Sequence, residues 1–245
     1  MSTTFDLPAE LSASLAGPAA AWRFVERFAA HLGAPVEEAH GCTEEELAAA
    51  EQRLGLPLPG ALREAYGRFG RRFDLFGGQE QWIPLEDVEV EDGILIFMAE
   101  RYWYWAVGIR LDQAGGDDPP LVTDATPGDP VEAEWEPMAD RFSAAFVESV
   151  LNGNLLCDDM GGMRREMVPG DLDHVEREFT PVPPFEEGPT EDGRRWYAGP
   201  EVLVCIDRTD PDVELGWLCV RAFNRQALDG MCAALRGDWT YTMNY

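Results

Sequence analysis

The sequence predicts an α+β fold in which helices pack on a central, mostly antiparallel sheet, followed by a C-terminal ββα extension. Apolar residues recur at helical spacing between residues 19 and 69, and short apolar runs typical of strands begin at Trp82. A stretch rich in Gly, Pro and acids then precedes further strands and a helix. We therefore expect an α+β domain over 1–152 with an extra N-terminal helix, a loop-rich connector over 153–192, and a ββα unit over 193–245.

Two helices are expected first. Trp22, Val25 and Leu32 share one face of a helix over 19–32, which ends at Gly33. Thr43 and Glu46 then fit a capping box, in which each side chain accepts a hydrogen bond from the backbone amide of the other. The helix that this box opens is expected to end at Gly55 in a left-handed conformation.

A tight turn and a third helix follow. The segment Leu56 to Pro59, LPLP, cannot continue a helix, because each Pro lacks a donor and favours an extended residue before it. Pro59 suits the first turn of the next helix, whose inward face would include Leu62, Tyr66 and Phe69. The segment therefore predicts a helix, tight turn, helix unit.

Short strands are predicted after this unit, with turns at Glu91-Asp92-Gly93 and at 114–118. The expected strands are 83–88, 94–98, 103–109, 120–123 and 131–135. A helix from Phe142 is expected to stop near Asn152-Gly153, before loop-rich residues 158–192. The C-terminal unit would hold strands at 196–197, 201–206 and 215–222 and a helix over 226–235, and it would either continue the first sheet or form a small lobe.

Charge is distributed unevenly along the chain. The net charge is −27, and all 19 basic residues are Arg, a usage that indicates a GC-rich bacterial genome. Residues 73–100 hold 8 acids and residues 111–140 hold 9, and neither stretch has a basic residue. Such a surface repels phosphate backbones and anionic membranes and attracts cationic proteins. We expect a basic protein partner, with no nucleic acid and no membrane; acidity that serves only solubility is the alternative.

The N-terminal segment, the lack of long apolar runs and the cysteine spacing predict localisation and redox state. The first 20 residues lack a basic segment followed by a continuous apolar core, and no window has the roughly 20 apolar residues of a membrane span. We therefore expect a cytoplasmic protein, monomeric or weakly dimeric. The 5 cysteines are odd in number and never spaced as CxxC, so reduced and mostly buried thiols are expected.

The sequence lacks the common motifs for catalysis and cofactor binding. It contains no GxSxG elbow and no GxGxxG turn, and without Lys it offers neither a phosphate loop nor a Schiff base. The 3 histidines have no paired spacing that would suit zinc. We expect no cofactor, no metal and no enzymatic activity. A hydrolase that uses surface carboxylates is the least favoured alternative, and it would need a cleft with two close acids.

The segment Cys42 to Gly70, CTEEELAAAEQRLGLPLPGALREAYGRFG, resembles the SUKH superfamily in its capped helix, Glu51, the LGLPLP turn, Leu62 and Tyr66. The resemblance covers about thirty residues closely and 42–152 loosely. In that family a later strand pair often carries Glu-Asn-Gln-Gly followed by a Trp. Glu100 and Trp105 match here, whereas Arg101 and Tyr102 replace the amide pair. No binding role is therefore transferred from that pair.

The resemblance implies an α+β fold with helices on a largely antiparallel sheet, and it implies a binding function rather than a catalytic one. The superfamily includes bacterial immunity proteins that neutralise polymorphic toxins and fungal cell-wall-synthesis regulators of the Smi/Knr type. An immunity protein that masks a toxin, such as a basic nuclease, is the favoured hypothesis. An intracellular scaffold or regulatory protein of the cell-wall-regulator type is the alternative.

The aromatic segment 100–109, ERYWYWAVGI, supplies the remaining candidate residues. Strand alternation would place Trp103 and Trp105 in the core with Val107 and Ile109, and the tyrosines on the opposite face. Tyr and Arg are favoured anchors in protein interfaces. The candidate partner-binding residues are therefore Glu86, Asp87, Glu89, Glu91, Asp92, Glu100, Arg101, Tyr102 and Tyr104.

Overall fold

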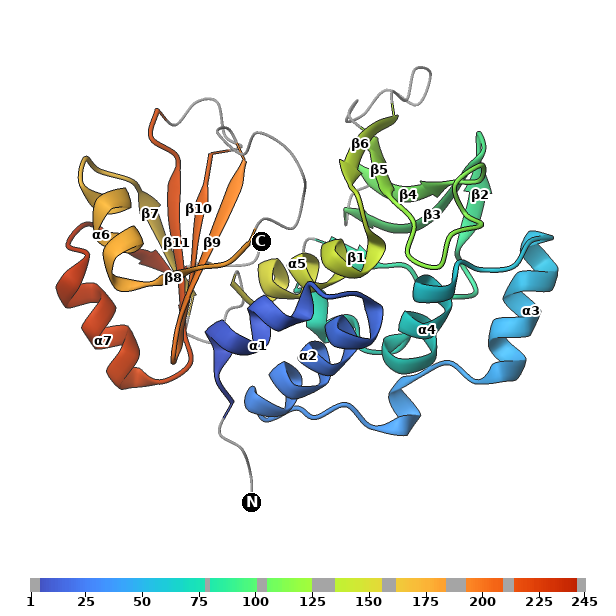
Figure 1. Ribbon diagram of the computed structural model, residues 1–245, viewed down its shortest axis with the longest axis horizontal. Coiled ribbons are helices and arrows are strands. Elements are labelled where there is room, and N and C mark those ends of the chain that lie inside the picture. The colour runs from blue at the N-terminus through green and yellow to red at the C-terminus, as the bar shows by residue number, and fades with distance from the viewer. Residues whose placement is uncertain are drawn as a thin grey trace.

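The computed structural model describes residues 5–77, 80–100, 105–124, 135–155, 162–183, 193–208 and 214–241. The predicted α+β class is confirmed, with helices packed on antiparallel sheets (Figure 1). The described helices are α1 (Leu7–Ser14), α2 (Pro18–His31), α3 (Glu44–Leu54), α4 (Gly60–Phe69), α5 (Phe142–Leu155), α6 (Asp171–Glu178) and α7 (Arg225–Ala234). Two 3-10 turns, η1 (Glu38–His40) and η2 (Phe73–Phe76), flank the α3–α4 unit.

The first sheet has the strand order β1-β3-β4-β5-β6, and β2 pairs with the same side of β3 as β1 does. Its strands are β1 (Glu80–Trp82), β2 (Glu89–Glu91), β3 (Ile94–Glu100), β4 (Ala106–Arg110), β5 (Leu121–Asp124) and β6 (Trp135–Ala139). All of these pairs are antiparallel. Strand β3 pairs with β1, β2 and β4 and is buried from Ile94 to Ala99.

The C-terminal strands form a second antiparallel sheet of order β12-β7-β11-β10-β9-β8. Its strands are β7 (Gly162–Glu166), β8 (Thr180–Pro181), β9 (Arg194–Gly199), β10 (Val202–Asp207), β11 (Trp217–Ala222) and β12 (Thr240–Tyr241). Of the two arrangements that the sequence left open for this unit, the structure therefore has a separate sheet.

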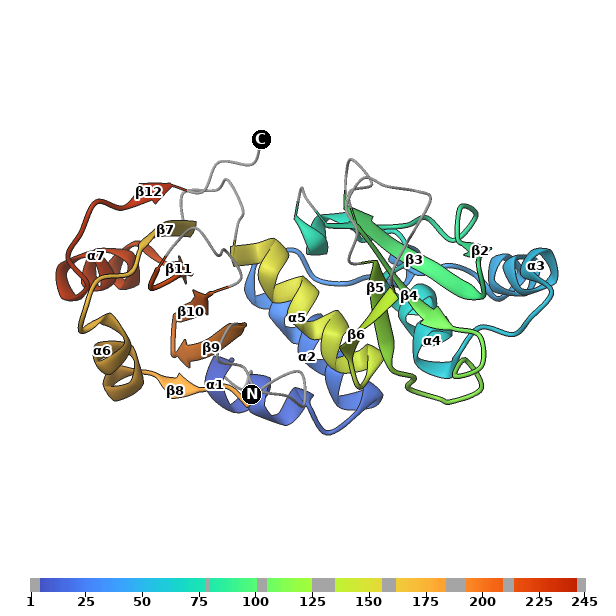
Figure 2. The ribbon, with the colours of Figure 1, turned by 90° about the horizontal axis from the view of Figure 1, so that it is seen from above.

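Helices α1, α2 and α5 lie between the two sheets, and α6 and α7 cover the outer face of the second sheet (Figures 1 and 2). Alternation along β10 explains this arrangement, because Leu203 and Cys205 join the central core while Val204 and Ile206 join a separate outer core. On the other side of the helices, Trp82 stacks on Phe76 and meets Phe146 of α5 edge-on. One apolar core therefore runs from the first sheet to the inner face of the second.

The α3–α4 unit matches its prediction closely. Thr43 caps α3 and forms both bonds of the capping box with Glu46, and Gly55 ends the helix with φ 73° in the left-handed region. Pro59 is the N-cap of α4, one position earlier than expected. The turn between β2 and β3 is also confirmed, with positive φ at Asp92 and Gly93.

The strand predicted over 83–88 is wrong, since these residues form a loop between β1 and β2. Its carbonyl groups are bonded by side chains in place of a neighbouring strand. Arg53 of α3 donates to the carbonyls of Val88 (2.7 Å) and Leu85 (3.0 Å), and the Tyr66 hydroxyl donates to the Ile83 carbonyl (2.8 Å). The apolar residues of the segment remain buried, which explains the strand-like pattern.

The predicted end of α5 near Gly153 is also wrong, because the helix continues to Leu155. A Cβ atom at Gly153 would lie 2.2 Å from the backbone carbon of Phe76, and one at Gly77 would lie 2.7 Å from the Gly153 carbonyl oxygen. Gly153 therefore permits a close backbone approach between α5 and η2 and does not end the helix.

The connector expected over 153–192 is in part regular structure, since β7, α6 and β8 lie within it and join the second sheet. Strand β7 contains consecutive arginines, so it lacks the alternating apolar pattern of a strand. Arg165 is nevertheless buried, donating two hydrogen bonds of 2.7 Å to Asp171 and lying over the Trp239 ring. The ion pair fastens β7 to the first turn of α6.

The predicted strands over 103–109 and 131–135 lie only partly within the described residues. Strand β4 begins at Ala106, and the predicted residues 103 and 104 lie outside the described part of the chain. Trp105 is half-buried against the core as expected. Alternation would place Ala106 on the opposite face with the tyrosines, yet Ala106 is buried as well. Residues 131–134 lie outside the described residues, and β6 starts at Trp135. Helix α1 is short and lacks a clear amphipathic pattern, and it was not predicted.

Candidate protein-binding site

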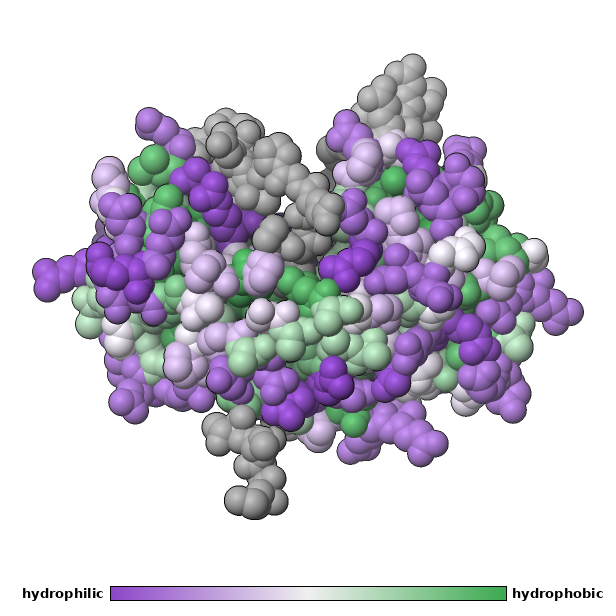
Figure 3. Space-filling model, in the orientation of Figure 1, coloured by the Kyte–Doolittle hydropathy of each residue, from purple (hydrophilic) through white to green (hydrophobic). Residues whose placement is uncertain are grey.

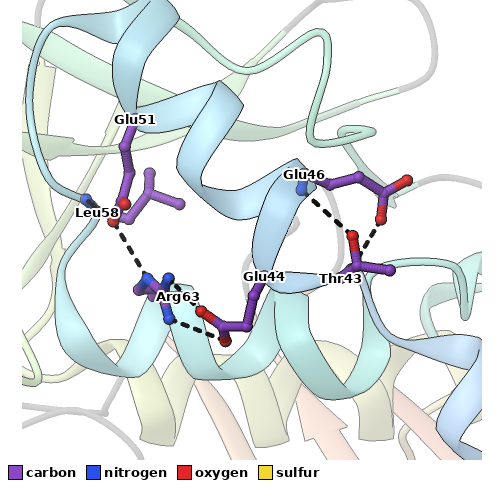
Figure 4. A network of polar contacts seen from close by, with 6 residues as sticks. All are labelled: Thr43, Glu44, Glu46, Glu51, Leu58 and Arg63. Atoms are coloured by element: carbon purple, nitrogen blue, oxygen red, sulfur yellow. Dashed lines mark hydrogen bonds and ion pairs between the residues drawn. The ribbon is translucent and has the colours of Figure 1, made fainter.

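The α3–α4 unit is fastened by carboxylates and an arginine (Figure 4). Arg63 of α4 donates to both oxygens of Glu44 (2.8 and 3.3 Å) and to Glu51 (3.2 Å). Glu51 also accepts a hydrogen bond of 3.1 Å from the amide of Leu58, inside the LPLP turn. Glu51 therefore holds the turn in place and has a structural role, which its position in the SUKH-like motif did not reveal.

Next to this unit lies the acidic edge, which we define as Glu86, Asp87, Glu89, Glu91 and Asp92. All five residues are exposed. Strand β2 is exposed at each of its three positions, including Val90, which is 38% exposed. Because successive side chains point to opposite faces of a strand, both faces of β2 meet solvent. The end of the molecule with α3 and β2 is largely hydrophilic, with smaller apolar areas (Figure 3).

In the described part of the chain, the carboxylates of the acidic edge form no direct bond with a cation, although Arg71 interacts electrostatically with Glu86. Within the described ranges, no ion pair or side-chain hydrogen bond involves any of the five. Arg53 of α3 donates to the carbonyls of the 83–88 loop and to none of these carboxylates. The five charges are therefore available to a cation from outside the molecule.

The structure does not bring Glu100 to the acidic edge. Glu100 is half-buried at the far end of β3 from Ile94, which pairs with Glu91 of β2. Six residues of strand separate Ile94 from Glu100, which is about 20 Å at the usual rise per residue. The other predicted site residues, Arg101, Tyr102 and Tyr104, lie outside the described residues.

A cavity of about 700 Å³ opens beside the acidic edge, between α3, the end of α4 and the 83–88 loop. Apolar groups form much of its wall, and Phe73 in that wall is 45% exposed. The lining residues are Cys42, Glu46, Ala49, Ala50, Arg53, Gly70, Arg71, Phe73, Pro84, Leu85 and Glu86. Leu85 and Glu86 belong to the loop that leads into β2, so the cavity and the acidic edge are continuous.

Most charged groups of the cavity already have partners. Arg71 donates to both oxygens of Glu46 (2.6 and 2.7 Å) and to the Gly41 carbonyl, and Glu46 also accepts from the Thr43 amide. Arg53 is bonded to the loop carbonyls. Among the charged lining residues, Glu86 is the one with no hydrogen bond or ion pair in the described part of the chain, although its charge interacts with that of Arg71.

Two titratable groups of the cavity, Glu46 and Cys42, have pKa values shifted by their surroundings. The hydrogen bond from the Thr43 amide and the bond from Arg71 lower the pKa of Glu46, so its carboxyl stays ionised. Burial raises the pKa of the Cys42 thiol more than the nearby Arg71 lowers it, so the thiolate is disfavoured. A carboxylate held ionised is a poor proton donor, and a protonated thiol is a poor nucleophile.

The sequence did not indicate the cavity residues Cys42, Ala49, Arg71 and Phe73, because the cavity forms between segments that are distant in the chain. In the part that the structure describes, no three His, Cys, Asp or Glu side chains are grouped to hold a metal ion. Among the described helices, none is long and apolar enough to cross a membrane. Comparisons of the chain with protein-family models, with curated proteins and with solved structures gave no significant match.

Proposed function

We propose that this chain is a non-enzymatic protein-binding module that neutralises a toxin, as bacterial immunity proteins do. The observation that carries the proposal is the acidic edge, where five exposed carboxylates have no partner among the described residues. A compact group of unpaired carboxylates raises the free energy of the isolated protein slightly through mutual repulsion. Binding of a basic surface relieves this repulsion and releases free energy.

The mechanism is occlusion of the partner's basic surface. A toxin that acts on nucleic acid needs a cationic surface to hold phosphates. The acidic edge would occupy that surface through its exposed carboxylates. The partner would then be unable to bind its substrate, and no chemistry on this chain is required.

The α3–α4 unit supports the choice of an immunity role. Its capped helix, left-handed Gly55 and LPLP turn are the residues that resemble the SUKH superfamily, and they position Arg53 against the loop of the acidic edge. The resemblance indicates that the partner is a toxin, and the acidic edge indicates that the partner has a basic surface.

The test compares two charge-reversed variants of equal net charge. In the first, the five residues of the acidic edge are replaced by Arg; in the second, five exposed acids of the second sheet and its helices are replaced by Arg. The control residues are Asp173, Glu176, Glu178, Asp229 and Asp238. Each variant is used to bind the partner that copurifies with the wild-type protein from its native host, and binding is measured by calorimetry.

We expect the first variant to bind at least a hundredfold more weakly and the second to bind nearly as the wild type, since local charge pairs are worth several kcal/mol. Equal affinities of the two variants would contradict the proposal. Co-expression decides between the two family roles: the partner of an immunity protein kills cells that lack this chain, whereas the partner of a scaffold or regulator does not.

A further inference from the structure

We infer that the cavity beside the acidic edge receives an arginine side chain from the basic partner, and that this arginine anchors the complex. The inference rests on the proposed function, because it specifies how the same surface recognises its partner.

The size of the cavity fits a side chain together with its flanking backbone. A volume of about 700 Å³ lies within the range of roughly 300 to 1,000 Å³ that is usual for ligand pockets. A single side chain fills only part of such a volume, so an extended segment of a partner can enter with it. The open side of the cavity adjoins the acidic edge at Glu86, which allows one segment to contact both.

The wall suits a side chain with an apolar stem and a flat cationic end. Ala50, Leu85 and Pro84 offer surface to the methylene stem, and Phe73 offers a partly exposed ring. A guanidinium stacks on an aromatic ring and binds a carboxylate through two parallel hydrogen bonds. Lysine lacks this planar end, so arginine fits the combination better.

The charges around the mouth of the cavity also favour a cation. The wall holds two arginines and two carboxylates, Glu46 and Glu86, so its own charges balance. Arg71 is bonded to Glu46, and Arg53 is bonded to the carbonyls of the loop. The exposed Asp87 and Glu89, close to Glu86 in the chain, add the excess negative charge that attracts a cation.

The probe is a capped peptide with one arginine between alanines, and its control is the same peptide with citrulline, which has nearly the same shape without the charge. Binding to the whole protein is followed by the amide NMR shifts of Ala49, Phe73 and Leu85. We expect the arginine peptide to shift these signals at concentrations at which the citrulline peptide leaves them unchanged. Equal shifts with both peptides would overturn the inference.

Two matched pairs of variants locate the binding. Ala49 is exposed and lines the cavity, whereas Ala48 is exposed on the same helix and does not line it. We expect Ala49→Phe to weaken arginine-peptide binding about tenfold or more by filling the cavity, and Ala48→Phe to have less than a twofold effect. The second pair tests the charge: we expect Glu86→Gln to weaken binding of the arginine peptide and Glu45→Gln on α3 to leave it unchanged. This pair tests the arginine site even if Ala49→Phe does not fold.

Failure of the inference and failure of the proposed function have different signatures. If charge reversal of the acidic edge abolishes binding of the native partner but Ala49→Phe binds it as Ala48→Phe does, the arginine site is wrong and the binding function stands. If the two charge-reversed proteins bind the native partner equally, the proposed function is wrong, and the peptide measurements still report on the cavity itself.

Discussion

Helices α3 and α4 and the acidic edge are neighbours and are both rich in carboxylates, yet their carboxylates have opposite surroundings. In the helices, Glu44, Glu46 and Glu51 each bond an arginine of this chain. In the acidic edge, five carboxylates have no such partner among the described residues. The contrast shows two kinds of acid in this chain: paired acids join segments of the fold, and the acids of the acidic edge face solvent, where the proposed partner would bind.

The largest effect is expected where a paired acid is buried. Asp171→Ala would leave Arg165 buried and charged without its carboxylate, which costs about 3 to 5 kcal/mol of unfolding free energy. Urea unfolding measures the loss. Asp173→Ala, at an exposed position of the same helix, is the control and is expected to change stability by less than about 0.5 kcal/mol. Similar losses in both variants would remove the distinction between buried paired acids and exposed ones.

A smaller loss is expected at Glu51. Glu51→Ala removes the acceptor of the Leu58 amide and one partner of Arg63, which costs about 1 to 2 kcal/mol. The measurement is again urea unfolding, with Glu45→Ala on an exposed position of α3 as the control. If Glu51→Ala proves as mild as the control, the carboxylate does not hold the LPLP turn.

Glu148 of α5 differs from both groups, because it is a carboxylate without an arginine bonded to it, and it accepts a hydrogen bond of 2.9 Å from Trp196. Burial raises its pKa, against the opposing effects of the Trp196 bond and of Arg194. A group whose pKa is raised by folding stabilises fully at acidic pH, and the contribution is lost as pH rises through the folded pKa.

Glu148→Gln has no such loss, so we expect it to be more stable than the wild type at neutral pH and equal to it at strongly acidic pH. Thermal unfolding between pH 4 and pH 8 follows the difference, with Glu45→Gln as the exposed control. A stability difference that does not depend on pH would show that Glu148 is not the group that titrates.

The smallest effect on stability is expected at the acidic edge. Replacing its five carboxylates by their amides removes only repulsion between exposed charges, so stability should stay within about 0.5 kcal/mol or rise slightly. Urea unfolding of this variant in low and high salt provides the measurement. A loss of several kcal/mol would mean that these acids support the fold as Glu51 does.

The parts of the fold that could be predicted are those whose information is local. The capping box at Thr43, the turn glycine at Gly55 and the Asp92-Gly93 turn depend on bonds between near neighbours, and the structure confirms them. The 83–88 loop and β7 were missed because their stability comes from distant groups. Arg53 bonds the loop and Asp171 neutralises the strand's buried arginine.

The candidate site divides in the same way. The charge of the acidic edge and its exposure followed from composition, since a run of acids without bases rarely lies in a core. The cavity could not be predicted, because α3, η2 and the 83–88 loop form it only after they pack together. Gly153 was likewise interpreted as the end of a helix, whereas it permits a close approach to the backbone of Phe76. The sequence alone does not distinguish a glycine that ends a helix from one that permits such a contact.

The two bonds from Arg53 to the carbonyls of Leu85 and Val88 have a consequence for the kinetics of association. They fix the loop between the cavity and β2 before any partner arrives, so little conformational entropy is lost when the complex forms. A rigid, charged surface captures its partner in one diffusive step that electrostatic attraction accelerates. We therefore expect a fast association rate that falls steeply with ionic strength, and a dissociation rate that changes little with salt.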